Sequence, residues 1–318
     1  MMDFMRWICL LLPIVIFAKI TIIEEPANIA PWFTGPIVAS SATTVPAGHW
    51  NFELYFYATD TPANYNSHWK PIDQPTLWTL TWQPVIWAGV TDWMDIQLTP
   101  TWNWNHKEGA GHWTLSDLFL KFEFQLHRDQ IPHTSWLPSI KLSFGEVFPI
   151  GKYQNASPKK HGTDLGGEGA YGTRIQLALG KLIHIKDWHW IQTRLNLNYQ
   201  FSPPVHVKGI NAYGGGLDTR GTVHPGMQFS FDYSLEYSLT RNWALAIDVI
   251  GNYQGTSHFT GKTTVSSSFP VSIQYSLAPA IEYNWNENLG IITGAWFTVA
   301  GKNSQEFYSF VFAVNYYK

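Results

Sequence analysis

Residues 95–105 read DIQLTPTWNWN and alternate without a break between apolar and polar side chains. The apolar positions are Ile96, Leu98, Pro100, Trp102 and Trp104, and the polar positions are Asp95, Gln97, Thr99, Thr101 and Asn103. Because successive side chains of a strand point to opposite faces, the pattern predicts a β-strand with one apolar and one polar face. Proline cannot donate a ladder hydrogen bond, so Pro100 indicates either a bulge or the end of this strand, and we favour the bulge.

The same alternation recurs in twelve segments, each of about ten residues or slightly more. The segments are 49–58, 76–88, 93–104, 115–127, 136–149, 170–183, 189–201, 225–238, 243–254, 269–285, 289–299 and 307–317. The connections between them run about 17, 4, 10, 8, 19, 5, 23, 4, 14, 3 and 7 residues, so long and short alternate throughout. Membrane barrels of the bacterial outer membrane have this arrangement, with short periplasmic turns and longer extracellular loops.

The sequence therefore predicts an all-β fold, a closed transmembrane antiparallel β-barrel of the outer-membrane type with about twelve strands. Lipid offers no hydrogen-bond partner, so an open sheet edge is excluded and the first strand is expected to pair with the last. The last segment carries Tyr308, Phe310, Phe312, Val314 and Tyr316 on one face and stops at the chain end. An even strand number places both termini in the periplasm.

The amino-acid composition agrees with a chain that faces apolar surroundings on one side and polar surroundings on the other. Charged residues make up only 14% of the chain and aromatics reach 16%, with 17 Trp, whereas soluble domains average about 25% charged residues. No stretch after residue 20 is apolar for the roughly 18 residues of a membrane helix. The net charge of -3 gives no indication of nucleic-acid binding.

The first residues, MMDFMRWICLLLPIVIFAK, have the pattern of a secretory signal peptide, with a basic start and a short apolar run. We expect a signal peptide over 1–18, an extended periplasmic segment over 19–47 and the barrel over 48–318. The single cysteine, Cys9, lies in the signal peptide, so the mature chain would have no thiol. Tryptophans near the ends of the strands (Trp93, Trp136, Trp190 and Trp243 at one end, Trp78, Trp102 and Trp104 at the other) predict two aromatic belts.

Several short phrases resemble a known family. They are GVTDWMDIQL (89–98), SFGEVFPIG (143–151) and LAPAIEYNWNENLG (277–290). Together they are similar to the outer-membrane channel proteins grouped with the MetA protein of phenol-degradation pathways. The resemblance implies a barrel that transports small or aromatic solutes, and it carries over no catalytic residue.

Two motifs have plain interpretations. GGEGAYG (166–172) contains a GxGxxG spacing, but it leaves a loop and enters a strand, whereas the dinucleotide fingerprint must open a helix. Seven histidines fall in or beside predicted extracellular loops without metal-site spacing: His68, His106, His112, His161, His206, His224 and His258. We expect neither a cofactor nor a metal, and we find no segment that matches the catalytic groups of outer-membrane phospholipases or proteases. The chain is therefore not expected to be an enzyme.

Charged residues on the polar parity are the candidate pore-lining side chains. The basic ones (Lys121, Lys141, Arg174 and Arg194) belong to strands four to seven, together with Glu123, and the other acidic ones are Glu53, Asp95, Asp232, Glu236, Asp248 and Glu282. Two interpretations stay open. Interior charges simply pair and fill the lumen, or opposite walls of opposite charge create a transverse field across a narrow pore.

The predicted function is a porin-like channel that passes small solutes, aromatic or otherwise hydrophilic or amphiphilic, by passive diffusion through the outer membrane of a Gram-negative bacterium. The alternative is a non-conducting barrel that serves as an adhesin or structural protein through its long loops. A soluble all-β protein is the third possibility. The expected partners are outer-membrane lipid, small-molecule solutes and, during biogenesis, the barrel-assembly machinery, with the oligomeric state open. The connection 202–224 is a candidate for an inward-folded constriction because of its length.

Overall fold

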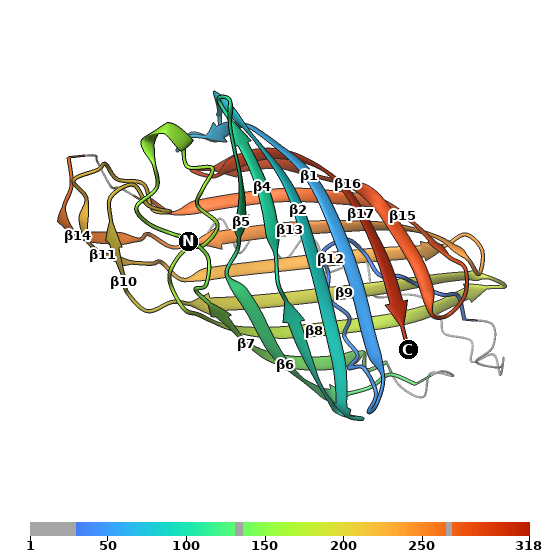
Figure 1. Cartoon of the computed structure of the whole chain (residues 1–318). Helices are drawn as coiled ribbons and strands as arrows, with labels where there is room; N and C mark the ends of the chain where they lie inside the picture. The colour runs from blue at the N-terminus through green and yellow to red at the C-terminus, as the bar shows by residue number, and fades with distance from the viewer. Residues whose placement is uncertain (1–29, 131–135, 265–268) are drawn as a thin grey trace.

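The computed structural model describes residues 30–130, 136–264 and 269–318, so the predicted signal peptide and Cys9 lie outside the described residues. Antiparallel strands form one continuous sheet that closes on itself, since β1 (Trp50–Tyr65) pairs with both β2 (Pro71–Thr91) and β17 (Gln305–Tyr317). Figure 1 shows the resulting barrel. None of the described residues forms a helix long and apolar enough to cross a membrane.

Twelve barrel strands arise from fourteen segments, because β3 runs on into β4 and β5 runs on into β6. In order, the remaining segments are β3 (Met94–Thr99), β4 (Trp102–Lys107), β5 (Ala110–Leu115), β6 (Leu118–His127), β7 (Ser139–Phe148), β8 (Gly172–Lys186), β9 (His189–Phe201), β12 (Gln228–Ser238), β13 (Trp243–Gln254), β15 (Ser272–Asn284) and β16 (Leu289–Lys302). The predicted all-β closed barrel is confirmed, and most predicted strand ends lie within a few residues of those observed.

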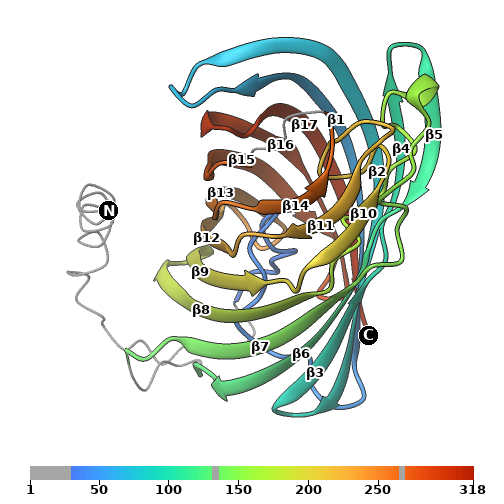
Figure 2. The same cartoon turned by 90° about the vertical axis from the view of Figure 1, so that its left-hand side faces the viewer.

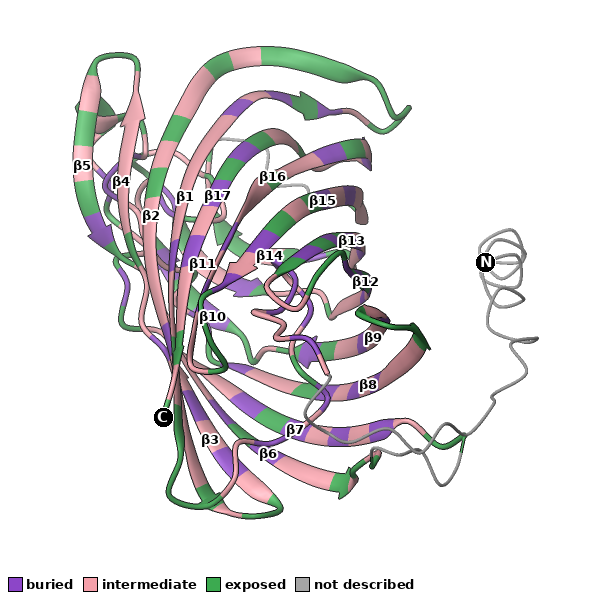
Figure 3. Cartoon of the chain, turned by 90° about the vertical axis from the view of Figure 1, so that its right-hand side faces the viewer, coloured by how far each residue is buried: buried purple, intermediate pink, exposed green. Residues whose placement is uncertain are grey.

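The two faces of the wall follow the period-two pattern (Figure 3). In β13, Trp243, Leu245 and Ile247 are exposed, while Ala244 and Ala246 between them, and Asp248 after them, are buried. Large apolar side chains therefore point outward to the lipid, and small or polar ones point inward. Trp93, Trp136, Trp78 and Trp102 are also exposed, as the aromatic belts require, but Trp190 is not. It has the inward parity of β9 and packs on His184, with ring centroids 4.3 Å apart.

The first hairpin is longer than the alternation indicates. β1 and β2 stay paired up to Tyr65 and Pro71, which leaves a turn of only residues 66–70 where the sequence predicts a 17-residue connection. This part of the hairpin lies beyond the apolar band and carries polar residues on both faces, so it has no apolar and polar alternation to detect.

The prolines mark breaks in the ladders. β2 pairs with β3 and β4 in one unchanged register, from Ile86↔Leu98 to Trp82↔Trp102, which places Pro84 opposite Pro100. The bulge expected at Pro100 is absent from this ladder but present in the ladder on the opposite side of the strand. The extra residue lies on the other neighbour, because Thr99 pairs with Phe119 but Trp102 pairs with Leu115.

Two further prolines lie before a strand, and Pro279 faces a gap in one of its two ladders, since it pairs with Ile247 but with no residue of β16. Pro138 and Pro270 precede β7 and β15, so both predicted strands begin later than expected. Pro279 lies within β15, where the pairing with β16 passes from Leu277↔Phe297 to Ala280↔Gly294. A residue without an N–H group fits such positions because no ladder bond is lost there.

A second, three-stranded sheet lies at the end that carries the long loops. It consists of β10 (Val205–Lys208), β11 (Arg220–His224) and β14 (His258–Lys262), and Figures 1 and 2 show it across the mouth of the barrel. Val205, Val207 and Val223 form a small apolar core beneath it with Ala170. The 202–224 connection, expected to fold inward, thus builds most of a lid, and we call this sheet the lid. The end with the short turns, such as 187–188 and 239–242, is assigned to the periplasm.

Residues 150–168 of the β7–β8 connection, which include the 3-10 helix η3 (Pro158–Lys160), fold against the free edge of β5. The backbone N–H of Gly151 donates to Asp117, and the Asn105 amide donates to the carbonyls of Thr163 and Leu165. The connection therefore covers a strand edge that has no neighbouring strand among the described residues.

Candidate functional site

The N-terminal segment 31–46, here called the plug segment, runs inside the barrel (Figures 1 and 2). It is extended, without strand pairing. Its first part contacts the periplasmic end, where the backbone N–H of Trp32 donates to the carbonyl of Arg241 at 3.1 Å. The sequence indicates an extended segment in the periplasm. The structure instead places residues 31–46 in the lumen, because the barrel wall supplies partners for their peptide groups.

Wall carboxylates accept the N–H groups of the plug segment. The bonds run from Thr34 (2.7 Å) and Gly35 (3.3 Å) to Glu282, from Val38 (3.3 Å) and Ala39 (3.2 Å) to Asp248, and from Val45 (2.7 Å) to Asp95. Bonds from backbone N–H groups to a charged acceptor contribute more than neutral ones, roughly 1.5–3 kcal/mol each. Three of the predicted pore-lining acids therefore hold the chain's own N-terminal segment.

Wall cations and amides donate to the carbonyls of the same segment. Asn284 bonds Trp32 (3.0 Å), Asn315 bonds Thr34 (3.2 Å), Arg194 bonds Ala39 (3.3 Å), Asn196 bonds Ser40 (3.2 Å), Gln125 bonds Ala42 (3.0 Å), Lys141 bonds Thr43 (3.4 Å) and Arg128 bonds Thr44 (2.9 Å). Acids thus accept N–H groups and bases donate to C=O groups, while the Gln125 amide does both, since its oxygen accepts the N–H of Thr44 at 2.8 Å.

Side-chain packing adds to these polar contacts. Ile37 is buried in an apolar patch of the inner wall that includes Tyr55, Val85, Ile250 and Ile292. Burying an isoleucine side chain contributes about 1.5–3 kcal/mol. The plug segment is therefore fixed by one apolar anchor and by a set of main-chain bonds.

Glycines of the wall make room for the plug segment. A Cβ on Gly89 would lie 1.8 Å from the Pro46 carbonyl oxygen, and one on Gly180 would lie 2.8 Å from the Ala42 Cβ. A Cβ on Gly290 would lie 2.4 Å from the Thr34 hydroxyl. These positions accept glycine alone while the plug segment keeps its present path.

All eleven residues predicted to line the pore lie on the inner wall. Glu53, Arg174 and Arg194 are half-buried and line the cavity beside the plug segment; the other eight, Asp95, Lys121, Glu123, Lys141, Asp232, Glu236, Asp248 and Glu282, are buried. Several of them pair. Glu123 contacts Lys121 at 2.7 Å and Lys141 at 3.0 Å, and Arg194 contacts Glu236 at 2.9 Å.

Within the described residues, two carboxylates on this wall, those of Asp232 and Glu236, have no hydrogen-bond partner on either oxygen, although Glu236 forms its ion pair with Arg194. Oε1 of Glu282 is likewise without a partner. Acidic side chains therefore exceed basic ones on the β12–β15 wall. No group of three or more His, Cys, Asp or Glu side chains among the described residues could hold a metal ion.

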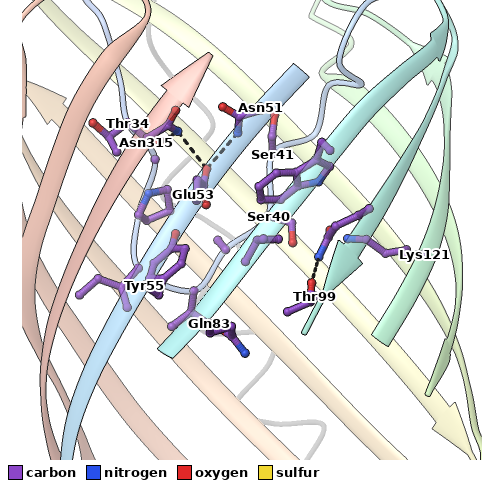
Figure 4. Close-up of a pocket in the computed structure, with 18 of the residues that line it drawn as sticks. Thr34, Ser40, Ser41, Asn51, Glu53, Tyr55, Gln83, Thr99, Lys121 and Asn315 are labelled. Carbon is purple, nitrogen blue, oxygen red and sulfur yellow. Dashed lines mark hydrogen bonds between the residues drawn. The ribbon is translucent and has the colours of Figure 1, made fainter. Parts of the chain in front are cut away.

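Two cavities remain in the lumen. The larger, of about 1020 Å³, lies between the plug segment and the wall and reaches residues 287–290 at the periplasmic turn (Figure 4). The smaller, of about 760 Å³, lies under the lid. Arg174 and Asn198 line both cavities. The Arg174 guanidinium donates to Gln200 at 2.8 Å and lies 4.8 Å from the centre of the Phe119 ring.

Sequence reasoning missed the plug segment and its amide partners. A signal was present, since residues 26–52 contain no Asp, Glu, Lys or Arg and residues 39–44 are all Ala, Ser or Thr. A neutral run of small residues fits inside a lumen, but the same composition also describes a linker. Composition alone could not separate the two.

No family model matches this sequence, and no curated protein matches it. Among solved structures, the COG4313 outer membrane channel from Pseudomonas putida F1 superimposes with a TM-score of 0.68 over 89% of this chain and 100% of that chain, at 10% identity. The chain has the fold of an outer-membrane β-barrel. The translocator domain of the autotransporter NalP from Neisseria meningitidis gives a TM-score of 0.42 over 85% and 88% of the two chains at 13% identity. The TodX monoaromatic hydrocarbon channel deltaS2 mutant gives 0.39 over 86% and 90% at 10% identity.

Proposed function

We propose that this barrel is a channel for the passive diffusion of small solutes across the outer membrane, and that the plug segment gates it. The observation that carries the proposal is the pair of cavities, which meet at Arg174 and Asn198 and together run from the lid to the periplasmic turn. A barrel that served only to display loops has no need for two large polar cavities in its lumen.

The plug segment is held by interactions that can reverse. Its contacts are hydrogen bonds and the packing of Ile37 with a few small buried side chains, and no strand of the barrel pairs with it among the described residues. Displacing it would join the present cavities into a wider passage. Sieving by size and the wall charges would then select the solute. We propose as solutes small aromatic compounds, which the resemblance to the MetA group implies, or other small hydrophilic or amphiphilic compounds.

Deletion of residues 31–46 tests it. We expect a several-fold rise in single-channel conductance in planar bilayers and faster liposome swelling with small neutral solutes. A heat-modifiable gel shift verifies that the deleted barrel has folded. A folded deletion variant without ion current or solute flux would contradict the channel and favour the adhesin or structural alternative.

A further inference from the structure

The lumen changes its chemistry along its axis. The periplasmic half carries the charged side chains that bind the plug segment, whereas the wall above Arg174 is formed by neutral amides and hydroxyls. Register places Gln200, Gln228 and Gln254 side by side on β9, β12 and β13. A second row, one step lower, consists of Asn198, Ser230, Asn252 and Gln274 on β9, β12, β13 and β15. Both rows face the cavity under the lid.

Three of these amides have unused hydrogen-bonding capacity. Gln228, Asn252 and Gln254 make no hydrogen bond to another side chain or to the backbone within the part of the chain that the structure describes. Each carries one carbonyl acceptor and two N–H donors. Neighbouring strands are about 4.8 Å apart, so adjacent amides of a row can bond adjacent polar groups of one ligand.

The lid provides a different surface opposite this wall. Tyr213 and Phe269 line the same cavity, with ring centroids 6.3 Å apart in an edge-to-face arrangement. The Tyr213 hydroxyl is buried and has no hydrogen-bond partner among the described residues. Aromatic rings accept C–H faces, and a free tyrosine hydroxyl accepts or donates one further bond.

Charge is nearly absent from the cavity. Glu168 and Arg174 are the only charged residues among those that line it, and Arg174 is already bonded to Gln200. Away from Arg174 at the lower boundary of the cavity, Glu168 is the only other lining residue with which an ion could pair. A hydrocarbon would cover the free amides without giving them partners, which is unfavourable. A neutral molecule with many hydroxyl groups and apolar C–H faces satisfies both the amide rows and the rings.

We infer that the cavity under the lid is a binding site for neutral polyhydroxylated solutes of the sugar class. This inference rests on the proposed channel function and names its solute class. The amide rows bond the hydroxyls, and Tyr213 and Phe269 cover the apolar face of the ring. The site lies at the extracellular entrance, above the junction formed by Arg174 and Asn198.

The test uses the full chain in planar bilayers, with raffinose and maltotriose as probes and phenol as the aromatic comparison. We expect the sugars, added on the lid side, to block the ion current in a saturable way. The triple variant Gln228→Leu, Asn252→Leu, Gln254→Leu removes no internal bond and should raise the half-blocking concentration about tenfold or more. The control, Gln83→Leu with Asn103→Leu, removes two amides from the lower cavity and should leave that concentration unchanged.

Two results would overturn the inference. One is that the sugars block the ion current of the triple variant and of the wild type equally. The other is that phenol blocks the current of the triple variant more strongly than that of the wild type. Calorimetry on the detergent-solubilised chain separates this result from failure of the channel itself. Sugar binding without ion current would retain the site and refute the channel. Ion current without sugar binding would retain the channel and refute the site.

Discussion

The carboxylate of Glu282 accepts a hydrogen bond from the backbone N–H of Thr34 at 2.7 Å, across 248 positions of sequence. With Asp248 it receives four N–H groups of the plug segment. The double variant Glu282→Gln, Asp248→Asn keeps the side-chain shapes but replaces charged acceptors with neutral ones. We expect it to weaken the plug by about 2 kcal/mol, which favours the displaced state about 30-fold.

Single-channel recording measures this change as a larger open fraction. Glu53→Gln is the matched control, because Glu53 is a lumen carboxylate that accepts bonds from Asn51 and Asn315 and not from the plug segment. An equal effect of the control and the double variant would show that net lumen charge, rather than plug binding, sets the open fraction.

An engineered disulfide between positions 42 and 180 would fix the plug segment to the wall reversibly. A Cβ at Gly180 would lie 2.8 Å from the Ala42 Cβ, and a disulfide needs about 3.8 Å between the two Cβ atoms, so a small shift of the plug segment suffices. We expect the Ala42→Cys, Gly180→Cys variant to conduct only after reduction. Each single cysteine variant is the control. Equal conductance before and after reduction, with the crosslink verified by mass spectrometry, would mean that the plug segment does not move during conduction.

Arg174 controls the passage between the two cavities. No carboxylate among the described residues lies within ion-pair distance of its guanidinium, so its charge is available to passing ions. We expect Arg174→Gln to shift the reversal potential toward cation preference by a change of several-fold in the permeability ratio. Arg220→Gln, on the exposed face of the lid, should have no such effect. An unchanged reversal potential in the Arg174 variant would place the selective step elsewhere.

The pair of Asp164 and Lys152 makes the β7–β8 connection sensitive to acid. Burial alone raises the pKa of the Asp164 carboxyl, but the hydrogen bond and positive charge of Lys152 outweigh burial and hold that pKa below 3.8. A lowered carboxyl pKa adds stability that is complete above the ordinary value and disappears as the pH falls through the folded value. The effect is modest because Lys152 is half exposed.

Hydrogen exchange measures this effect. After correction for intrinsic rates, amides of residues 150–168 should lose protection below about pH 4 in the wild type. Lys152→Met should remove most of that pH dependence while leaving the barrel strands protected. If the variant and the wild type lose protection at the same pH, the ion pair does not stabilise the connection.

Period-two patterning made most strands predictable because each one separates lipid from lumen. The pattern failed where that difference ends. The upper part of the β1–β2 hairpin faces polar surroundings on both sides, so the pattern predicts a loop there. Trp190 was assigned to a belt by residue type, although its parity with Gln192 and Arg194 indicates the inward face.

The candidate site was predictable only in part, for a physical reason. Parity brought the charged residues to the inner wall, but it contains no information on what they contact. The plug segment makes most of its hydrogen bonds to the wall through peptide groups, which every residue possesses. Its sequence therefore contains no side-chain motif from which these bonds could be predicted. The lid likewise depends on pairing between β11 and β14, which are far apart in sequence.

The plug's reliance on its main chain has a consequence for how such proteins diverge. Between residues 38 and 43, replacement of one small side chain by another leaves the main-chain hydrogen bonds to the wall in place, whereas Thr44 also bonds the wall through its hydroxyl. The wall has no such freedom, since Asp95, Asp248 and Glu282 each act through a specific carboxylate. Among proteins that share a common ancestor, the sequence of the plug segment should therefore change quickly, while the wall residues that bind it stay the same. Plug segments of two such barrels would then be interchangeable even when their sequences no longer resemble each other. Exchanging the plug segments would test whether the two barrels share an ancestor.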